Sequence, residues 1–512
     1  MQDIIIGKHT LESLTTGMYA DPFVIYREYI QNAADSIDAA FESGVLCRGE
    51  ECVDVIIHSA EKRIIIKDNG LGVYSDEAVS HLLSIGNSKK KSTATRGFRG
   101  IGRLSGLSYC STLTFETSAR GDTAGTRITI DANKLSEILA NVQNDTETIL
   151  DVLSEVYSIE TYPERENVHY FSVTMDGVDE SVKLTDYDEV IAYLSQNVPV
   201  PYHPEKFTWG REITNRLAQK GCVIESYKVF VTCQNKREPV YKPYGDSFLM
   251  DKGKKTTDRI SDVQIISFVN SDKELLAAGW VAKTSFLGSI YDRTIKGIRV
   301  RKGNILIGDG QTLNVAFKDA RFNGWSIGEI FAMHPKLVPN ARRDNFEKNP
   351  TYFTFIEKLT TLAGGVTREI RNVSLKRNAE LSAALEATAR VSEAAAAVMS
   401  EGVSLSQKSA LKNKLTKAQN AVGQVPVNGE SDAYYQGIAF EGLDILIGQV
   451  KGATSYKALN LLDNISLHEK RWLEQIFNII IRIEPGNSEK IITAVLDELY
   501  GESKKKGMET EP

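Results

Sequence analysis

Three polar residues on one predicted helix could carry chemistry. Glu28, Asn32 and Asp35 are spaced at i, i+4 and i+7, which places two carboxylates and an amide on one helical face. Apolar residues cover much of the remaining circumference, and a polar stripe on a buried helix is costly unless it binds something. Such a stripe alone is more typical of a solvated surface, so its interpretation depends on the segments that follow.

A glycine-containing turn follows a predicted strand over residues 63–67. Its sequence is Asp-Asn-Gly-Leu-Gly, at residues 68–72. Gly70 and Gly72 permit positive φ angles and a close approach of the backbone to a ligand. An ionised Asp68 can accept a hydrogen bond from an exocyclic amine. The turn is therefore a candidate ligand contact.

A second glycine-rich segment, at residues 97–102, has the sequence Gly-Phe-Arg-Gly-Ile-Gly and lies within a Gly/Ser/Lys/Thr-rich stretch over 86–106. This composition predicts a long mobile loop. Gly97, Gly100 and Gly102 could present backbone N–H groups to phosphates at the start of a following helix. One such motif is weak evidence, but the polar stripe and both glycine segments in this order indicate a nucleotide-binding site.

These segments resemble the ATP-binding domain of the GHKL superfamily, which comprises gyrases, ninety-kilodalton heat-shock chaperones, histidine kinases and mismatch-repair ATPases. The resemblance rests on the run from Tyr26 to Asp38 together with residues 68–72 and 97–102. Within the superfamily, the chaperone branch is most similar. Four further segments look like parts of that branch: residues 9–19, 85–88, 295–301 and 337–346.

The resemblance implies a role for each matching residue. Glu28 would be the general base that polarises the attacking water, and Asn32 would hold Mg²⁺, which bridges the phosphates of ATP. Asp68 would bind the adenine N6 amine, while Gly72 lets the base approach. Arg343 would reach the γ-phosphate from the middle domain. The other nucleotide-binding residues that the resemblance implies are Asp35, Gly70, Ser88, Gly97, Arg99, Gly100, Ile101 and Gly102.

Two positions depart from the pattern of the family. Its members usually carry a threonine near the adenine on the last strand of the domain. The dipeptide Gly125-Thr126 resembles this feature, but the strand predicted last covers residues 169–175 and contains no Gly-Thr. The contact therefore stays unassigned. His81 stands where the chaperone branch tends to carry asparagine, which leaves the details of the lid open.

The elements that must position these residues predict an α+β fold. Asp21-Pro22 is typical of a helix start, and the helix is expected to run to about Phe41. Strands are predicted at 53–58, 63–67, 112–117, 126–130, 158–162 and 169–175. Together these elements predict a two-layer α/β sandwich over residues 1–200, the GHKL-type ATP-binding domain.

The rest of the chain is expected to form two more domains and a tail. Prolines between Val198 and Tyr202 mark the predicted end of the first domain. An α/β middle domain is expected over 201–375, a helical C-terminal domain over 376–502, and a disordered tail over 503–512.

Apolar spacing predicts helices in the C-terminal domain. Residues 391, 395 and 398, and then 411, 415, 418 and 422, recur at helical spacing, which predicts a helical hairpin. Ser466 and Glu469 form a predicted capping box before an apolar stripe that begins at Trp472. By analogy with the family, and because apolar stripes need partners, these helices are expected to form a homodimer.

Composition excludes several classes of protein. The 512 residues are 42% hydrophobic and 25% charged, which is enough for several cores and does not fit a wholly disordered chain. No apolar run approaches the roughly 20 residues that cross a bilayer, and no signal-peptide pattern begins the chain. Five cysteines without a CxxC pair argue against a disulfide framework or a zinc site. We therefore expect a cytoplasmic protein that does not bind a membrane.

Charge is unevenly distributed along the chain. Residues 1–200 hold 17 basic and 31 acidic residues, whereas residues 201–375 hold 28 and 18. The basic middle segment could meet nucleic acid, the phosphates of a nucleotide, or the acidic first third, or it could be an ordinary solvated surface.

The preferred interpretation is an Mg-ATP-dependent, chaperone-like ATPase. ATP would act as a conformational switch, a lid would close over it, the middle domain would dock, and protein clients would be the substrates. The alternative is a nucleic-acid-engaging clamp like the mismatch-repair or Microrchidia branches, of the kind that could act in bacterial defence. A histidine kinase is disfavoured because about 20 residues precede the first motif. A non-hydrolysing module is disfavoured because Glu28 and Asn32 are both present.

Overall fold

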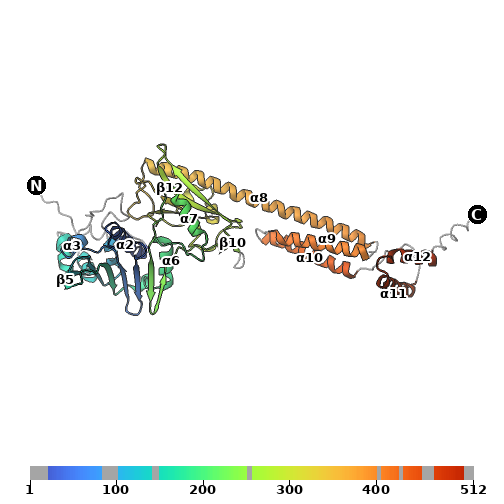
Figure 1. Cartoon of the computed structure of the whole chain (residues 1–512), viewed down its shortest axis with the longest axis horizontal. Helices are drawn as coiled ribbons and strands as arrows, with labels where there is room; N and C mark the ends of the chain where they lie inside the picture. Colours follow the sequence, from blue (N-terminus) through green and yellow to red (C-terminus); the bar gives the residue numbers. More distant parts are fainter. Residues whose placement is uncertain are drawn as a thin grey trace, which may run out of the picture. The chain divides into compact units, whose positions relative to one another are not determined.

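The computed structural model describes residues 21–83, 102–140, 149–250, 257–400, 405–425, 430–452 and 466–500 (Figure 1). The chain divides into two compact units, residues 1–368 and 369–512. Each unit is described by itself.

An eight-stranded sheet is the centre of the first part of unit 1. Its order is β5-β4-β3-β6-β2-β1-β7-β8, and every pairing is antiparallel except that of β1 with β7. The strands are β1 (Val53–His58), β2 (Arg63–Asp68), β3 (Thr112–Ser118), β4 (Ala124–Asp131), β5 (Tyr157–Pro163), β6 (Tyr170–Asp176), β7 (Val229–Cys233) and β8 (Lys236–Pro239).

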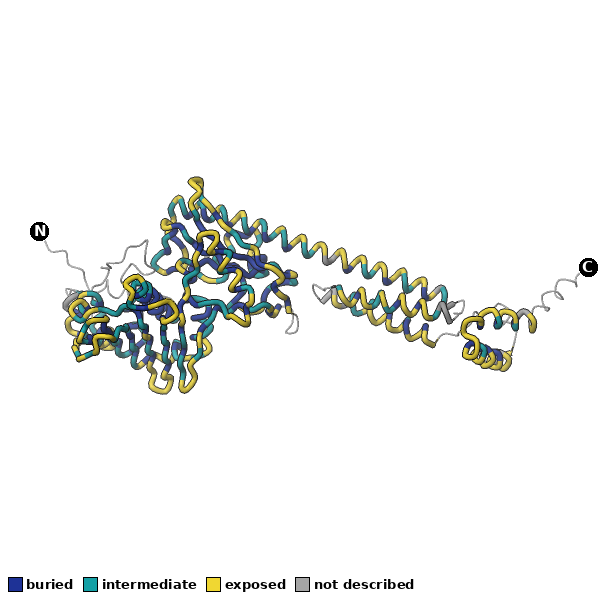
Figure 2. The backbone as a smooth tube through the Cα atoms, in the orientation of Figure 1, coloured by how far each residue is buried: buried dark blue, intermediate teal, exposed yellow. Residues whose placement is uncertain are grey.

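Helices cover one face of this sheet. Along β1, Val53, Val55 and Ile57 are buried and alternate with more exposed residues, as expected for a strand with one face on a core. The same core contains Ile30 and Ile37, which lie on α2 (Val24–Glu42). This arrangement confirms the predicted α+β layer sandwich (Figure 2). The other helical elements of this part are α3 (Ser75–Leu83), η1 (Gly102–Ser108), α4 (Ala132–Ala140), α5 (Ile149–Val156), η3 (Glu180–Val182) and α6 (Tyr187–Asn197).

The sheet extends past the boundary that the sequence predicts at residue 200. Strands β7 and β8 lie beyond it, and β7 pairs with β1 in a register that places Val229 opposite Val53. Val198 and Val200 are buried in the same core as β1. The proline-containing segment is therefore packed into the domain, because its valines contribute apolar surface.

The second part of unit 1 contains a five-stranded sheet and a separate strand pair. The sheet order is β11-β12-β15-β13-β14, and β9 pairs with β10. Trp280 on β12 is fully buried in the core of this part. The elements are α7 (Trp209–Ala218), β9 (Ser247–Leu249), β10 (Thr257–Arg259), β11 (Asp262–Val269), β12 (Leu275–Lys283), β13 (Gly297–Lys302), β14 (Ile305–Ile307), η4 (Thr312–Ala316), η5 (Ala320–Trp325) and β15 (Ile327–Ala332).

The described residues of unit 2 are helical, as predicted. Helix α8 (Pro350–Ser400) begins in unit 1 and is followed by α9 (Leu405–Gln424), α10 (Glu430–Gly452), α11 (Leu467–Ile483) and α12 (Ser488–Tyr500). Ala395 and Leu415 pack with Leu443 of α10, so the predicted hairpin is completed by a third helix.

The start of α11 has the predicted local structure. Ser466 and Glu469 form a capping box in which each side chain bonds the backbone of the other residue. Among the described residues, no helix is both long and apolar enough to cross a bilayer.

Candidate functional site

Glu28 lies buried on α2 beside two arginines. Its Oε1 accepts a hydrogen bond from Nη2 of Arg27 at 3.2 Å, and it lies 3.8 Å from Nε of Arg343. The side chains of Arg27, Glu28 and Arg343 are 7%, 9% and 10% exposed. The structure therefore brings together two residues that the sequence singled out separately, Glu28 and Arg343.

A tight turn holds Arg343 in position. The backbone of Arg343 has φ +58°, a region that non-glycine residues adopt mainly where the surrounding structure requires it. Its N–H donates to the carbonyl of Asn340 at 3.1 Å, and its carbonyl accepts from the N–H of Gly308 at 2.8 Å. Arg27 also donates to the carbonyl of Arg342 at 3.4 Å. The bond from Arg27 links the 340–343 turn to α2.

Gly102 lies against the other oxygen of the same carboxylate. A Cβ atom at this position would lie 2.4 Å from Oε2 of Glu28. Gly102 begins η1, whose backbone is held by Tyr29: the Tyr29 hydroxyl donates to the carbonyl of Arg103 at 3.1 Å and accepts from the N–H of Gly106 at 3.0 Å. Burial raises the pKa of Tyr29 well above its usual range, so the hydroxyl stays protonated and can donate.

Asp68 ends β2 and begins the predicted glycine turn. It is 5% exposed, and its Oδ1 accepts from the N–H of Gly70 at 2.8 Å. The N–H of Leu71 donates to the carbonyl of Ser36 on α2 at 3.2 Å. Gly72 has φ +69°, and a Cβ there would lie 1.9 Å from the carbonyl oxygen of Ser118. Only glycine fits at residue 72 without displacing the backbone.

A row of side chains continues from Asp68 across the sheet. The register places Asp68 opposite Phe171, Phe171 opposite Thr117, and Thr117 opposite Thr126, and directly opposed residues share one face of a sheet. The strand beside Asp68 therefore presents Phe171, and Thr126 lies three strands away, roughly 14 Å at the usual strand spacing. The motif Gly125-Thr126 is thus displaced from Asp68.

Thr117 is a site residue that the sequence analysis missed. Its hydroxyl accepts from the N–H of Val73 at 2.9 Å and donates to the carbonyl of Tyr170 at 2.9 Å. It therefore supports the turn that follows Gly72. Its position inside the predicted strand over 112–117 offered no signal, because only the cross-strand register brings it to the turn.

The remaining predicted residues divide into two groups. Asn32 is half-buried and Asp35 is 7% exposed, and both lie on α2. The other group, Ser88, Gly97, Arg99, Gly100 and Ile101, lies outside the described residues.

The described residues fit an adenine nucleotide with Mg²⁺. The Asp68 carboxylate is buried at the start of the glycine turn, and an ionised carboxylate there can accept a hydrogen bond from the exocyclic amine of adenine. No cluster of three or more metal-binding side chains occurs among the described residues. Proteins usually bind Mg²⁺ through one or two side-chain oxygens plus substrate phosphates, and Asn32 could offer such an oxygen.

Comparison with known families agrees with this geometry. Residues 22–161 match the family model described as "Histidine kinase-, DNA gyrase B-, and HSP90-like ATPase". The match includes α2 and the Asp68 turn and ends within β5. This segment is therefore a GHKL-type ATPase domain.

A curated relative is similar over part of the chain. The "Chaperone protein HtpG" of Polaromonas naphthalenivorans (strain CJ2) is 30% identical over 129 residues. The matched stretch covers 22% of this chain and 20% of the relative. The chain thus resembles a chaperone over that stretch, and it spans a fifth of the relative's length.

Proposed function

We propose that the protein is a Mg-ATP-dependent ATPase in which nucleotide binding switches the conformation of the chain. The main observation in support of this proposal is the distance of 3.8 Å between Nε of Arg343 and Oε1 of Glu28. A cation from a segment over 300 residues away in sequence meets the buried acid of the ATPase domain. This supports a site that both domains complete.

In the proposed phosphoryl transfer, different residues of the chain would have different roles. Glu28 orients the attacking water and accepts its proton, and Arg343 stabilises negative charge on the transferring group. Asp68 binds the adenine amine, and Gly70 and Gly72 let the base approach.

The phosphate end of the site would use the second glycine segment. Asn32 holds Mg²⁺, which when bound neutralises phosphate charge. The N–H groups of residues 97–102 would bind the phosphates, and Asp35 would support the polar stripe of α2. Catalysis of this kind is mostly positioning and charge stabilisation.

Protein clients are the proposed substrates, and the cytoplasm is the proposed compartment. The similarity to the chaperone named above supports the first proposal. We further propose that the helices of unit 2 form a homodimer, since Trp472, Ile476, Ile479 and Ile483 of α11 are 42–71% exposed at helical spacing. An apolar stripe of this kind is typical of an interaction surface.

The test of the proposed ATPase compares the wild type with Glu28→Ala. We expect Glu28→Ala to lower the turnover number about a hundredfold, which corresponds to roughly 3 kcal/mol of barrier, while nucleotide affinity stays close to wild type. Steady-state phosphate release and calorimetric titration with ATP measure the two quantities. Normal hydrolysis by Glu28→Ala would refute the assignment of the general base.

A further inference from the structure

A cavity in the second part of unit 1 lies outside the nucleotide site. It has a volume of about 820 Å³, within the range of pockets that hold small ligands. Three segments line it: Lys206 before α7, residues 243–249 up to and including β9, and residues 291–296 between β12 and β13. None of the residues in these segments belongs to the proposed ATPase machinery.

The walls of the cavity are aromatic and apolar. Tyr244, Phe248 and Ile295 line it and are 3–7% exposed, so they belong to the packed core. Tyr291 and Leu249 also line it and are 56% and 41% exposed. The cavity thus combines a rigid apolar floor with an open apolar edge, which favours a ligand that inserts an apolar group.

The charged side chains of the cavity are mostly cationic. Lys206, Arg293 and Lys296 line it with a single carboxylate, Asp292. Asp292 is already engaged, because its Oδ1 accepts from both the N–H and the hydroxyl of Thr294, at 2.8 and 2.7 Å. Within the described part of the chain, neither Lys206 nor Arg293 lies within 4.0 Å of a carboxylate oxygen as an ion pair. Because three cations face one carboxylate, the lining of the cavity is net positive, which favours an anionic ligand.

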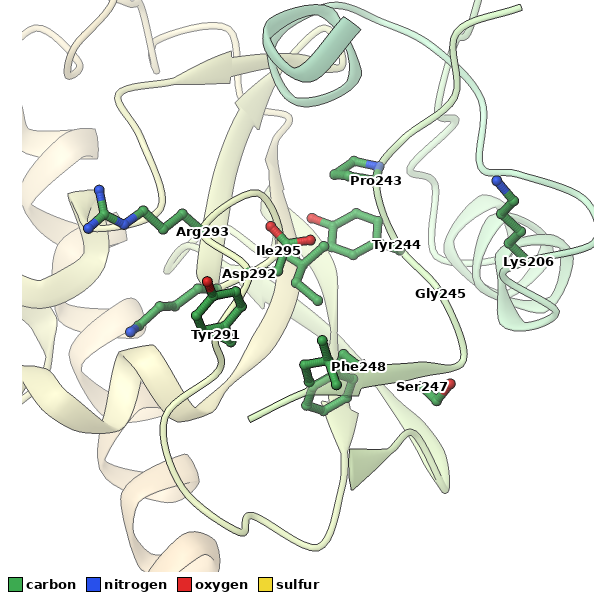
Figure 3. A pocket seen from close by; sticks show the side chains of 12 residues that line it. Lys206, Pro243, Tyr244, Gly245, Ser247, Phe248, Tyr291, Asp292, Arg293 and Ile295 are labelled. Atoms are coloured by element: carbon green, nitrogen blue, oxygen red, sulfur yellow. The ribbon is translucent and has the colours of Figure 1, made fainter. Parts of the chain in front are cut away.

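Two of the three cations, Lys206 and Arg293, lie on opposite sides of the aromatic floor. Figure 3 shows Lys206 on one side of the cavity and Arg293 on the other, with Tyr244 and Phe248 between them. A complementary ligand has negative charge on both sides of an apolar group. An extended polypeptide with acidic residues flanking an aromatic residue has this arrangement along its length.

We propose that this cavity binds an acidic polypeptide segment of a protein partner, with an aromatic side chain packed over the floor of Tyr244 and Phe248 and against the open edge formed by Tyr291 and Leu249. The alternative of single-stranded nucleic acid fits less well, since bases stack on exposed aromatic faces along a cationic track. Here two of the three rings are buried in the core, and only Tyr291 is open to solvent. This inference rests on the proposed action on protein clients, and it assigns one surface of the chain to the binding of such a client.

The experiment measures fluorescence anisotropy of a labelled peptide, Glu-Asp-Gly-Phe-Gly-Asp-Glu, with the full chain at low salt. Control peptides replace the phenylalanine with serine or every acidic residue with lysine. The test variant is Lys206→Glu with Arg293→Glu. The matched control is Lys220→Glu with Lys318→Glu, which makes the same charge change at two exposed residues that do not line the cavity. A milder pair, Lys206→Gln with Arg293→Gln, serves if the first destabilises the fold.

We expect saturable binding of the acidic phenylalanine peptide. The test variant should weaken it at least about tenfold, or 1.4 kcal/mol, and the matched control should leave it within about twofold. Both control peptides should bind much more weakly. Absence of binding, or equal effects of the test variant and the matched control, would overturn the proposal. Preferential binding of a labelled oligodeoxythymidine that the test variant abolishes would also overturn it, in favour of nucleic acid.

The readout is separate from the proposed ATPase function. Peptide binding is measured without nucleotide and repeated with Glu28→Ala, which should bind the peptide like the wild type. The ATPase rate of the Lys206→Glu, Arg293→Glu variant should also equal that of the wild type. Failure of the general-base assignment and failure of the peptide site therefore give different results.

Discussion

At the scale of single residues, the neighbouring arginines 342 and 343 occupy different environments. Arg343 is 8% exposed and lies 3.8 Å from the carboxylate of Glu28, whereas Arg342 is exposed and contacts Arg27 through its carbonyl. We expect Arg343→Ala to reduce the turnover number about a hundredfold, because the proposed mechanism would lose its charge contact to the transferring phosphoryl group. Arg342→Ala should stay within about twofold. Equal losses in steady-state ATP hydrolysis would rule out a distinct role for Arg343.

Gly72 allows a second prediction at this scale. Alanine there would adopt a left-handed backbone, at about 1–2 kcal/mol, and would also collide with the carbonyl of Ser118. Gly121 has φ +92°, and no atom lies within 4 Å of the place that a Cβ atom would occupy there, so Gly121→Ala bears only the backbone strain. Urea denaturation should show a larger loss of unfolding free energy for Gly72→Ala. A smaller or equal loss would mean that the turn shifts freely.

At the scale of elements, a buried ionic cluster joins β13, β15 and the segment after β8. Glu329 is fully buried and accepts from Nζ of Lys242 at 2.8 Å, from the hydroxyl of Tyr202 at 2.5 Å, and from Nε of Arg301. The hydroxyl of Tyr202 in turn accepts from the indole N–H of Trp280 at 2.9 Å. The cluster therefore ties the segment that follows α6 to the core of the five-stranded sheet.

Removing the central acid of this cluster should cost more than removing one cation. Glu329→Gln leaves Arg301 and Lys242 buried without a counter-charge, and we expect a loss of about 3–5 kcal/mol of unfolding free energy. Lys242→Met leaves Glu329 paired with Arg301, and the loss should be below about 1 kcal/mol. Chemical denaturation of both variants measures the difference. A larger loss of unfolding free energy for Lys242→Met than for Glu329→Gln would show that Lys242, and not Glu329, contributes more to the stability of the cluster.

The same cluster predicts a pH dependence of stability. Burial, together with the charge of Arg301, lowers the pKa of Lys242 to about 7, while the unfolded side chain titrates near its usual value of roughly 10.4. Between these values the unfolded state binds more protons, so the free energy of unfolding rises with pH. We expect this rise in the wild type relative to Lys242→Met when denaturation is repeated between about pH 7 and pH 9. If the free energy of unfolding changed with pH equally in the wild type and in Lys242→Met, the pKa of Lys242 would not be lowered in the folded state.

At the scale of the whole molecule, the exposed apolar stripe of α11 carries the proposed dimer. We expect Ile476→Lys with Ile479→Lys to convert the dimer to a monomer, because two charges would be buried at the interface. Gln475→Lys with Asn478→Lys adds the same charges to exposed residues beside the stripe, and this control should remain dimeric. Sedimentation velocity distinguishes the two states. A monomeric wild type, or dissociation in both variants, would exclude this surface.

Local patterns in the sequence were sufficient for part of this description. The spacing of Glu28, Asn32 and Asp35 predicts that they share one face of a helix. Gly70 and Gly72 predict a tight turn after Asp68. These inferences succeed because helical periodicity and turn geometry depend on residues a few positions apart.

Long-range contacts were decided only by the tertiary structure. Thr117 of β3 contacts the turn after Gly72, and β7, which follows the proline-containing segment, pairs with β1 of the first sheet. The turn at 340–343 contacts α2, although the two are about 300 residues apart in the sequence. Such contacts depend on how distant segments pack and pair, and no local propensity encodes that choice.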